Sequence, residues 1–459
     1  MVQENSPVSR RTVLRLLGAG GVALAGAPIL AACSSSSKST SSATTVAGSG
    51  TSATSGSAAT TGPAVAAGSV ADIAKYIGPI DAAHAAKGVS YTFGSVLALS
   101  GPGSFYGQVM SKGINLAVKH ISALGGPNFQ VVYKDHKSGD PTAGANAVRE
   151  LGLAKTPIML ASYVDDLGAM FAGSAQYQIL SLDGGGGTGL FGNSKPFFWG
   201  MRANTPVDPF PGVVEYLNQK MPKVKKIAFV EWDLGAEDKP INDDLRTQLA
   251  KGGLSVTTIQ ATTVGATDYS TAIQAVKSSN PDLLFVSLYG LDPGYFMKQY
   301  ATSGIGVPVI GYEFTPDAAK TAGSAYDNYM FAYDFFDAAH PTNPWAAIFV
   351  DEFKKAYNET PDFYAANYYE DTFAVWDLIR RVSASGGDIQ SGSALQTALQ
   401  SNPSFKSVYG GDSANAGTLA LDPQTHTPIK RPMGLFNYKG GNTTALAYFN
   451  IGGADFKLA

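Results

Sequence analysis

The stretch YTFGSVLALSGPGSFYGQVMSKGINLAVKHISAL, residues 91–124, carries the pattern that decides the fold class. Residues 91–99 form an almost continuous apolar run, which predicts a buried β-strand. From residue 106 to residue 124, apolar side chains return at helical spacing and predict an amphipathic helix. These side chains are Met110, Ile114, Ala117, Val118, Ile121 and Leu124. A buried strand that leads directly into such a helix is the first half of a βαβ unit.

The same alternation continues along the chain and then starts again. The expected strands of the first series lie at 129–135, 157–162 and 179–182, with helices at 141–153 and 167–176. After a proline-rich bridge at 206–211, the expected strands of the second series lie at 226–231, 255–261, 282–287 and 307–310, with helices between them. A short helical segment is expected before the first strand, at 69–88, and two helices and a β-rich tail are expected after residue 343. The sequence therefore predicts an α/β protein with two doubly wound parallel-sheet lobes.

Composition limits the classes of function. Hydrophobic residues make up 44% of the 459 residues, which is enough for two domains with sizeable cores. The chain has 33 basic and 36 acidic residues, so it offers no basic surface for nucleic acid. Its five histidines have no ligand-like spacing, and its single cysteine excludes both a disulfide within the chain and a cysteine-based metal cluster. We therefore expect no metal, no cofactor and no nucleic-acid partner.

The first residues predict export. Arg10 and Arg11 precede an apolar run at 16–32, which is typical of a signal peptide over residues 1–32 and is similar to a twin-arginine signal; an ordinary secretory signal is the alternative. The sequence from Leu30 to Cys33 resembles a bacterial lipobox, which predicts lipidation of Cys33 and anchoring to the lipid bilayer; a free thiol in an uncleaved signal is the alternative. Residues 33–68 are nearly all Ser, Thr, Ala and Gly and predict a disordered tether.

One pattern resembles an enzyme motif. Gly184-x-Gly186-x-x-Gly189 follows an expected strand and matches the dinucleotide-binding pattern. That pattern requires a helix that begins at once and places its N-terminus on the phosphate, and Pro196 with its neighbours would break such a helix. No Gly-x-Ser-x-Gly motif occurs, and no histidine lies beside a serine and an acid. We therefore expect a binding protein and not an enzyme, with a dinucleotide-dependent enzyme as an alternative.

The loops after the expected strands resemble the branched-chain amino-acid class of type I periplasmic binding proteins. The resemblance covers residues 89–440 and rests on motifs that occur in the order typical of the family. They are Leu99-Ser100-Gly101-Pro102 with Phe105-Tyr106-Gly107, Asp135 with Asp140-Pro141, Asp268-Tyr269-Ser270 with Asn280-Pro281-Asp282, Ile310-Gly311-Tyr312-Glu313, and Pro361-Asp362-Phe363-Tyr364. The resemblance implies a monomer that captures a small-molecule solute for an ABC permease in the membrane.

The family also implies two lobes joined by three crossing segments that close on the ligand like a hinge. Mapped onto this sequence, lobe 1 comprises 89–205 plus 333–420, and lobe 2 comprises 206–332 plus 421–459. The crossings are expected near 204–206, 332–335 and 419–422.

In open α/β sheets ligands bind beyond the carboxyl ends of the strands, so the loops at those ends should line the cleft. The ligand-binding residues expected there are Ser100, Tyr106, Ser162, Asp165, Asp183, Gly185, Thr188, Trp232, Tyr289, Glu313 and Tyr364. The resemblance implies that Glu313 receives the ammonium group of the ligand; a role as a surface charge is the alternative. The four aromatic residues of this set would form the walls of the cleft, or else belong to the core.

The loops after the third and fourth strands leave the solute open. In amino-acid-binding members of the family, hydroxyl groups and backbone amides of these loops hold the ligand's carboxylate. Ser162, Gly185 and Thr188 are suited to that role, since glycine amides can bind an anion. Asp165 and Asp183 would repel a carboxylate unless they point outward or cap helices. We expect an exported lipoprotein that binds an amino-acid-like solute or another amine or amide; a ligand-sensing receptor domain on the same fold is the alternative.

Overall fold

The computed structural model describes residues 65–101, 103–162, 164–186, 191–203, 207–233, 235 and 238–459, and for residues 164–167 it describes the backbone only. The expected signal peptide (1–32), Cys33 and nearly all of the expected tether (33–68) lie outside the described residues. Thr188 and residues 204–206 also lie outside them, as does the side chain of Asp165.

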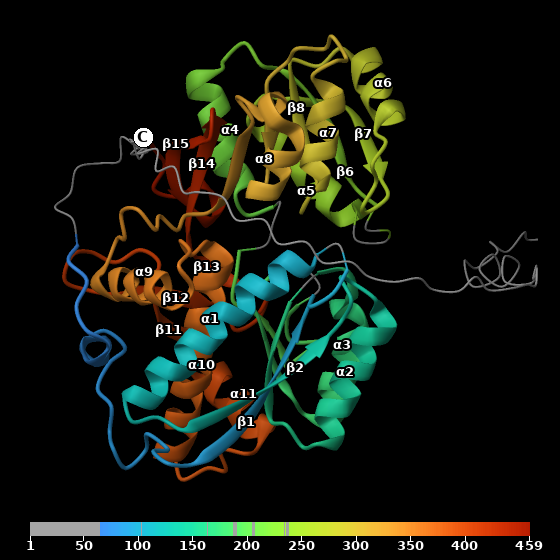
Figure 1. The fold of residues 1–459 in the computed structure, drawn as a ribbon. Coiled ribbons are helices and arrows are strands. Elements are labelled where there is room, and N and C mark those ends of the chain that lie inside the picture. Colours follow the sequence, from blue (N-terminus) through green and yellow to red (C-terminus); the bar gives the residue numbers. More distant parts are fainter. Residues whose placement is uncertain are drawn as a thin grey trace, which may run out of the picture. The chain divides into compact units, whose positions relative to one another are not determined.

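Five parallel strands form the first sheet, which we call sheet 1, in the order β2-β1-β3-β4-β5. The strands are β1 (Ser90–Leu97), β2 (Asn128–Asp135), β3 (Ile158–Ala161), β4 (Leu180–Asp183) and β5 (Phe198–Gly200), and the helices between them are α1 (Ser104–Ala123), α2 (Pro141–Leu153) and α3 (Val164–Tyr177). Phe93 packs in the cluster on the α1 side of the sheet and Val96 in the cluster on the α2 side. Both faces are therefore covered, as the sequence predicted (Figure 1).

The second sheet, sheet 2, has eight strands in the order β16-β15-β14-β10-β9-β8-β6-β7. Its parallel part consists of β6 (Lys226–Trp232), β7 (Ser255–Thr262), β8 (Leu283–Ser287), β9 (Val309–Gly311) and β10 (Met330–Asp334). The accompanying helices are α4 (Phe210–Lys220), α5 (Asp238–Lys251), α6 (Ser270–Ser279), α7 (Asp292–Tyr300), α8 (Pro316–Ala322) and the 3-10 turn η3 (Gly323–Tyr326). Leu249 of α5 packs on one face of the sheet and Phe296 of α7 on the other. The second predicted lobe thus also has a parallel, doubly covered sheet.

The C-terminal residues add antiparallel strands to the edge of sheet 2. These strands are β14 (Pro432–Lys439), β15 (Asn442–Asn450) and β16 (Lys457–Leu458), with the 3-10 turn η4 (Ile451–Gly453) between the last two. Gly440 and Gly441 join β14 to β15 with φ of +55° and +85°, the left-handed backbone that a two-residue hairpin turn requires. Sheet 2 is therefore mixed, whereas the sequence analysis expected a parallel sheet with a β-rich tail of unspecified pairing.

Three helices and a small sheet pack beside sheet 1. The helices are α9 (Pro344–Tyr357), α10 (Phe363–Ala384) and α11 (Gly392–Ser401), and the small antiparallel sheet contains β11 (Ser404–Ser407), β12 (Gly417–Leu421) and β13 (Pro428–Lys430). Helix α10 lies along α1, as Figure 1 shows. The small sheet is tied to β5 because the ring of His426 stacks on Trp199 with a centroid distance of 3.8 Å.

The segment before β1 differs from the expected helix at 69–88. It contains only the 3-10 turn η1 (Val70–Lys75), because Gly78 adopts a φ of +86° and Pro79 follows it.

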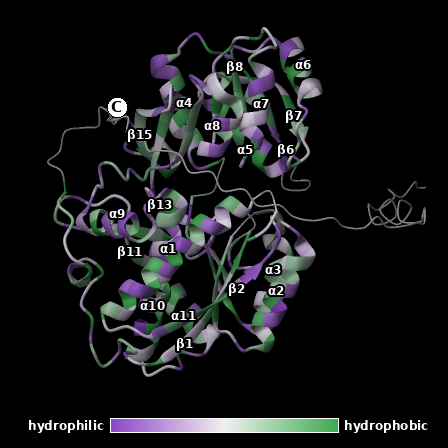
Figure 2. Cartoon of the chain, viewed as in Figure 1, coloured by the Kyte–Doolittle hydropathy of each residue, from purple (hydrophilic) through white to green (hydrophobic). Residues whose placement is uncertain are grey.

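The helices that flank both sheets show hydrophobic residues alternating with hydrophilic ones around their circumference (Figure 2). In the part of the chain that the structure describes, no helix combines the length and the apolar character needed to cross a membrane.

The chain passes between sheet 1 and sheet 2 three times. The first passage leads from β5 to α4, the second leaves sheet 2 after Asp334 at the end of β10, and the third passes Arg431 between β13 and β14. The third passage was expected at 419–422 and lies about ten residues later. The reason is that β12 pairs with β11 and β13, and Leu421 packs in the core beside sheet 1.

Gly113 allows the close contact between α1 and α10. A Cβ at this position would lie 2.3 Å from the backbone oxygen of Ala365, which cannot move without displacing α10. We expect Gly113→Ala to lower the free energy of unfolding by about 1–3 kcal/mol, since the overpacking outweighs the better helix propensity of alanine. Chemical denaturation measures this change. The matched control is Gly168→Ala in α3, where a Cβ meets nothing within 4 Å, and this variant should be neutral or more stable.

Candidate functional site

Glu313, two residues after β9, is the carboxylate at which side chains from both sheets meet. Its side chain is only 2% exposed. The hydroxyl of Tyr106, at the start of α1, lies 2.7 and 2.8 Å from the two carboxylate oxygens and donates to them. The hydroxyl of Tyr364, at the start of α10, lies 3.4 Å from Oε1, and the backbone N–H of Gly290 donates to Oε2 over 3.2 Å. Burial raises the pKa of Glu313, and the hydrogen bond from Tyr106 opposes this rise.

Three residues that the sequence analysis assigned to the site are therefore brought into contact by the structure: Tyr106, Glu313 and Tyr364. The two tyrosine rings also pack edge to face, with their centroids 5.0 Å apart. Both tyrosines belong to helices beside sheet 1 and Glu313 belongs to sheet 2, so the contact joins the two sheets at the carboxyl ends of their strands.

A second expected group lies at the end of β6 and β8. The indole N–H of Trp232 donates to Asp292 over 2.7 Å, and the ring of Tyr289 packs edge to face against the indole at 5.1 Å. The Tyr289 hydroxyl lies 3.3 Å from the hydroxyl of Ser287. Trp232 ends β6 and Tyr289 follows β8, both in the same sheet as the strand before Glu313. Tyr289 directly precedes Gly290, whose N–H binds that carboxylate.

The expected hydroxyl groups are used within the fold. Ser162 is fully buried, and its Oγ lies 3.1 Å from Nε2 of His136 and 3.4 Å from the backbone oxygen of Val96. Ser100 is exposed, and its hydroxyl donates to Asp135. The loop that carries Ser100 is thus fixed by a local contact, and neither hydroxyl contacts Glu313.

The glycine loop after β4 encloses two buried carboxyl groups. Asp183 accepts hydrogen bonds from the backbone N–H groups of Gly185 and Gly186 at 2.9 and 3.4 Å, so it caps its own loop. Its Oδ2 and both carboxyl oxygens of Asp371 have no hydrogen-bond partner among the described residues. Burial raises the pKa of Asp183 to about 7, and burial together with the charge of Glu370 raises the pKa of Asp371 well above its usual range. Near neutral pH these two groups carry less negative charge than the sequence suggests.

Arg202 lies between the glycine loop and Tyr364 and is not among the residues expected from the sequence. Its guanidinium is almost fully buried: Nη1 donates to the backbone oxygen of Gly185 over 2.8 Å and to the Tyr364 hydroxyl over 3.2 Å, and Nε donates to Asp334 over 2.6 Å. The guanidinium also lies over the rings of Phe363 and Tyr364, at 4.8 and 5.0 Å from their centroids. A signal was present, since Arg202 is a lone charge just after the apolar residues of a strand end.

Arg202 belongs to a buried ionic group that we call the crossing network: Arg202, Asp334, Arg431 and Glu370. Arg431 donates from Nε to Asp334 over 3.0 Å and from Nη1 to Glu370 over 2.5 Å. All four residues are at most 3% exposed. The network contains two guanidinium groups and two carboxylates, so its charges balance without Glu313.

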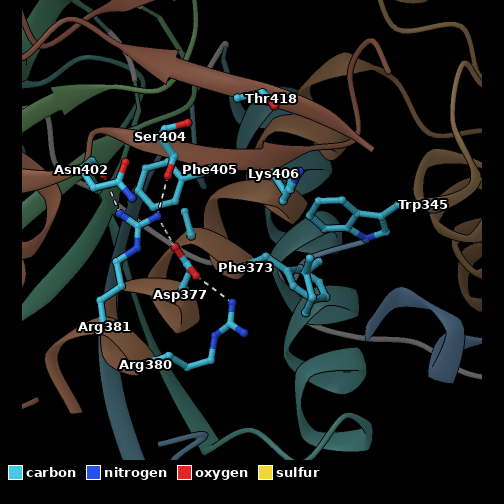
Figure 3. Close-up of a pocket in the computed structure, with 12 residues that line it drawn as sticks. Trp345, Phe373, Asp377, Arg380, Arg381, Asn402, Ser404, Phe405, Lys406 and Thr418 are labelled. Atoms are coloured by element: carbon cyan, nitrogen blue, oxygen red, sulfur yellow. Dashed lines mark hydrogen bonds and ion pairs between the residues drawn. The ribbon is translucent and has the colours of Figure 1, made fainter. Parts of the chain in front are cut away.

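Cavities occur both beside Tyr364 and further along α10. One, of about 650 Å³, has an aromatic wall drawn from elements beside both sheets; the wall includes Phe105, Phe314, Phe335, Phe363 and Tyr364. The other, of about 250 Å³, lies beside α10 and β11, where Asp377 sits between the guanidinium groups of Arg380 and Arg381 (Figure 3). Arg381 also donates to backbone oxygens of the β11 segment. Because Asp377, Arg380 and Arg381 of this second cavity bind one another within the fold, we assign no solute to it.

A family model described as periplasmic binding protein matches residues 90–442. The chain belongs to the periplasmic binding protein family. Among curated proteins, the Leu/Ile/Val-binding protein homolog 3 of Brucella melitensis is 24% identical over 233 residues, which are 48% of this chain and 61% of that protein. The chain thus matches less than two thirds of that relative's length.

Solved structures show the same type I fold. A solute-binding protein of an ABC transporter from R. palustris, in complex with benzoate, has a TM-score of 0.67 and 20% identity, with 81% of this chain and 98% of that chain covered. The leucine-binding protein LivK from Thermotoga maritima has a TM-score of 0.67 and 17% identity, with 78% of this chain and 98% of that chain covered. The branched-chain amino-acid binding protein LivJ from Streptococcus pneumoniae, in complex with isoleucine, has a TM-score of 0.65 and 20% identity, with 78% and 99% covered. At these identities the likeness is one of fold.

The raised pKa of Asp183 predicts a pH dependence of stability. An unfolded aspartate has a pKa near 3.9, so folding takes up a proton between that pH and about 7. The contribution of Asp183 to the free energy of unfolding is therefore greatest at low pH and is lost as the pH rises through about 7. Asp183→Asn keeps an acceptor for the loop amides and removes this titration. Between pH 5 and pH 8 the unaltered protein should lose about 2 kcal/mol more stability than the variant.

Urea denaturation of both proteins at these two pH values measures the difference. Asp140→Asn is the control, because Asp140 caps α2 at the surface through the backbone N–H groups of Thr142 and Ala143. Identical pH profiles for the unaltered protein and Asp183→Asn would show that Asp183 is ionised throughout.

Proposed function

We propose that this periplasmic binding protein is the extracytoplasmic solute-binding component of an ABC importer and performs no covalent chemistry. The observation that carries the proposal is the buried carboxylate of Glu313, which sheet 2 presents to hydroxyl groups from the helices beside sheet 1. A solute that binds here contacts both lobes at once. Such a solute stabilises the closed arrangement, because only that arrangement offers both sets of contacts.

The charges around the site favour a solute with a positive or N–H donor group. The crossing network balances its own charges, and the tyrosine hydroxyls donate to Glu313 without neutralising it. Glu313 therefore has no positively charged group in direct contact. A ligand ammonium or amide would supply a donor for this carboxylate. The isoleucine held by the LivJ structure carries such a group, whereas the benzoate of the R. palustris structure does not. We propose an amino-acid-like solute, with Trp232 and Tyr289 as apolar walls.

Thr188, Gly185 and the side chain of Asp165 complete the proposed site. Gly185 belongs to a loop whose neighbouring N–H groups already bind Asp183, so part of the capacity of this loop to hold a carboxylate is taken. The guanidinium of Arg202 donates to the backbone oxygen of Gly185 and so holds the same loop in place.

The function and the role of Glu313 are tested together. Mass spectrometry of the compound that co-purifies with the protein identifies the solute, and its addition should raise the melting temperature and decrease the radius of gyration. Glu313→Gln should weaken binding of this compound at least tenfold, about 1.4 kcal/mol, by titration calorimetry, because the ligand's donor group loses a charged acceptor.

Glu150→Gln is the matched control, since Glu150 pairs with Lys134 at the surface. It should leave the affinity unchanged. A co-purifying compound without a donor group would contradict the role of Glu313, and a compound that the protein returns chemically altered would contradict the binding function itself.

We further propose that Cys33 anchors the exported protein in the membrane. A diacylated cysteine supplies more than one chain, whereas a single acyl chain gives only marginal binding. Cys33→Ala should therefore move the protein from the membrane fraction to the soluble fraction in its native host, with the signal peptide uncut. Immunoblots of both fractions measure this, and Ser36→Ala, a nearby residue of the tether, serves as the control. Unchanged processing and unchanged membrane association of Cys33→Ala would exclude the lipobox.

A further inference from the structure

Each of the three passages between the sheets carries one member of the crossing network. Arg202 lies in the first passage, Asp334 begins the second, and Arg431 lies in the third. One carboxylate joins all three, because Oδ2 of Asp334 accepts from Arg202 over 2.6 Å while Oδ1 accepts from Arg431 over 3.0 Å. The three segments that must bend when the lobes move are therefore held by one side chain that is fully buried.

The geometry of this contact depends on the relative position of the three segments. A carboxylate that accepts from two guanidinium groups at once fixes both donors in direction as well as distance. Arg431 is held further by Glu370, and by Asn367, on α10, so it cannot easily follow a movement of Asp334. A rotation at the passages therefore stretches at least one of the two ion pairs, in a place where an unpaired charge is costly.

Arg202 also contacts the two sides of the proposed solute site. Its Nη1 donates to the backbone oxygen of Gly185 in the glycine loop and to the hydroxyl of Tyr364, and that hydroxyl lies against Glu313. A continuous path of polar contacts thus leads from Glu313 through Tyr364 and Arg202 to Asp334. The guanidinium also stacks on the ring of Tyr364, so Arg202 and Tyr364 are joined by two contacts.

We propose that Arg202 is a positioning residue that couples occupation of the solute site to the angle between the two lobes. A solute that draws Tyr364 or the Gly185 loop toward itself moves the guanidinium, and the guanidinium moves the carboxylate that joins the three passages. The proposal rests on the proposed function for the identity of the site. It goes beyond that function in assigning the hinge angle to one ionic contact.

The test measures the distance between the lobes in the full chain without added solute. Spin labels on Glu150→Cys in α2 and Lys251→Cys in α5, both exposed, report this distance by pulsed electron resonance in a Cys33→Ser background. Arg202→Lys keeps the charge but loses the planar fork, and it should roughly double the width of the distance distribution. Tyr364→Phe leaves the ion pairs intact and removes only the hydroxyl, and it should also broaden the distribution, by a smaller amount.

Arg381→Lys is the matched control, because Arg381 also pairs with a carboxylate and two backbone oxygens but lies outside the passages (Figure 3). It should leave the distribution unchanged. A purely structural role of Arg202 would lower the melting temperature without broadening the distribution, and that result would overturn the proposal. So would a Tyr364→Phe distribution identical to that of the unaltered protein.

Asp334→Asn replaces Arg202→Lys if that variant fails to fold, and it should broaden the distribution for the same reason. All of these readings are made without added solute. A failure of the proposed solute therefore appears in the mass-spectrometric test, and a failure of Arg202 and Tyr364 to hold the angle between the lobes appears here.

Discussion

The pairing of Asp334 with two arginines joins the three segments that connect the two lobes. A carboxylate with no exposure to solvent remains ionised only where opposite charges and donors surround it. Arg202 and Arg431 meet this requirement from the other two passages, so the electrostatic demand of one buried residue fixes three chain segments at once. The apolar clusters of each sheet stabilise the lobes separately. The ionic contact and the contact of Tyr106 and Tyr364 with Glu313 join residues of the two lobes.

The interior holds its other carboxyl groups by different means. Glu370 is paired with a guanidinium, as Asp334 is, and accepts further donors from the Ser407 hydroxyl and the Val408 N–H. Asp183 and Asp371 lie where burial favours the protonated form, so they avoid the cost of an isolated charge. Glu313 is surrounded by hydroxyl and amide donors without a cation in direct contact, and these donors come from elements beside both sheets. That difference in environment is the physical reason for assigning the solute to Glu313.

The alternation of apolar strands and helices was sufficient to predict most of the parallel strands of both sheets, because strands buried on both faces leave short apolar runs between amphipathic helices. It did not predict β5 and β10. The pairing of β14 with β10 was not predictable, since it depends on a long-range contact and on a hairpin turn at Gly440 and Gly441. At 69–88 the sequence predicted more regular structure than the chain forms. The apolar residues have helical spacing, but Gly78 and Pro79 prevent a longer helix. The third passage was misplaced because Leu421 belongs to a small sheet that local pattern does not reveal.

For the candidate site, the sequence indicated which loops lie near one another better than it indicated the partners of their side chains. The carboxyl ends of parallel strands meet at one edge, so Tyr106 and Glu313 could be expected near each other. Whether a hydroxyl or a carboxylate is free for a ligand depends on partners that are distant in sequence. His136 takes the hydroxyl of Ser162, and loop amides take Asp183. Arg202 was not predicted for the same reason. Its partner Asp334 lies 132 residues further along the chain, and only the fold brings the two together. The proposed solute site and the passages therefore share Arg202, because this cation contacts Tyr364 and the glycine loop as well as Asp334.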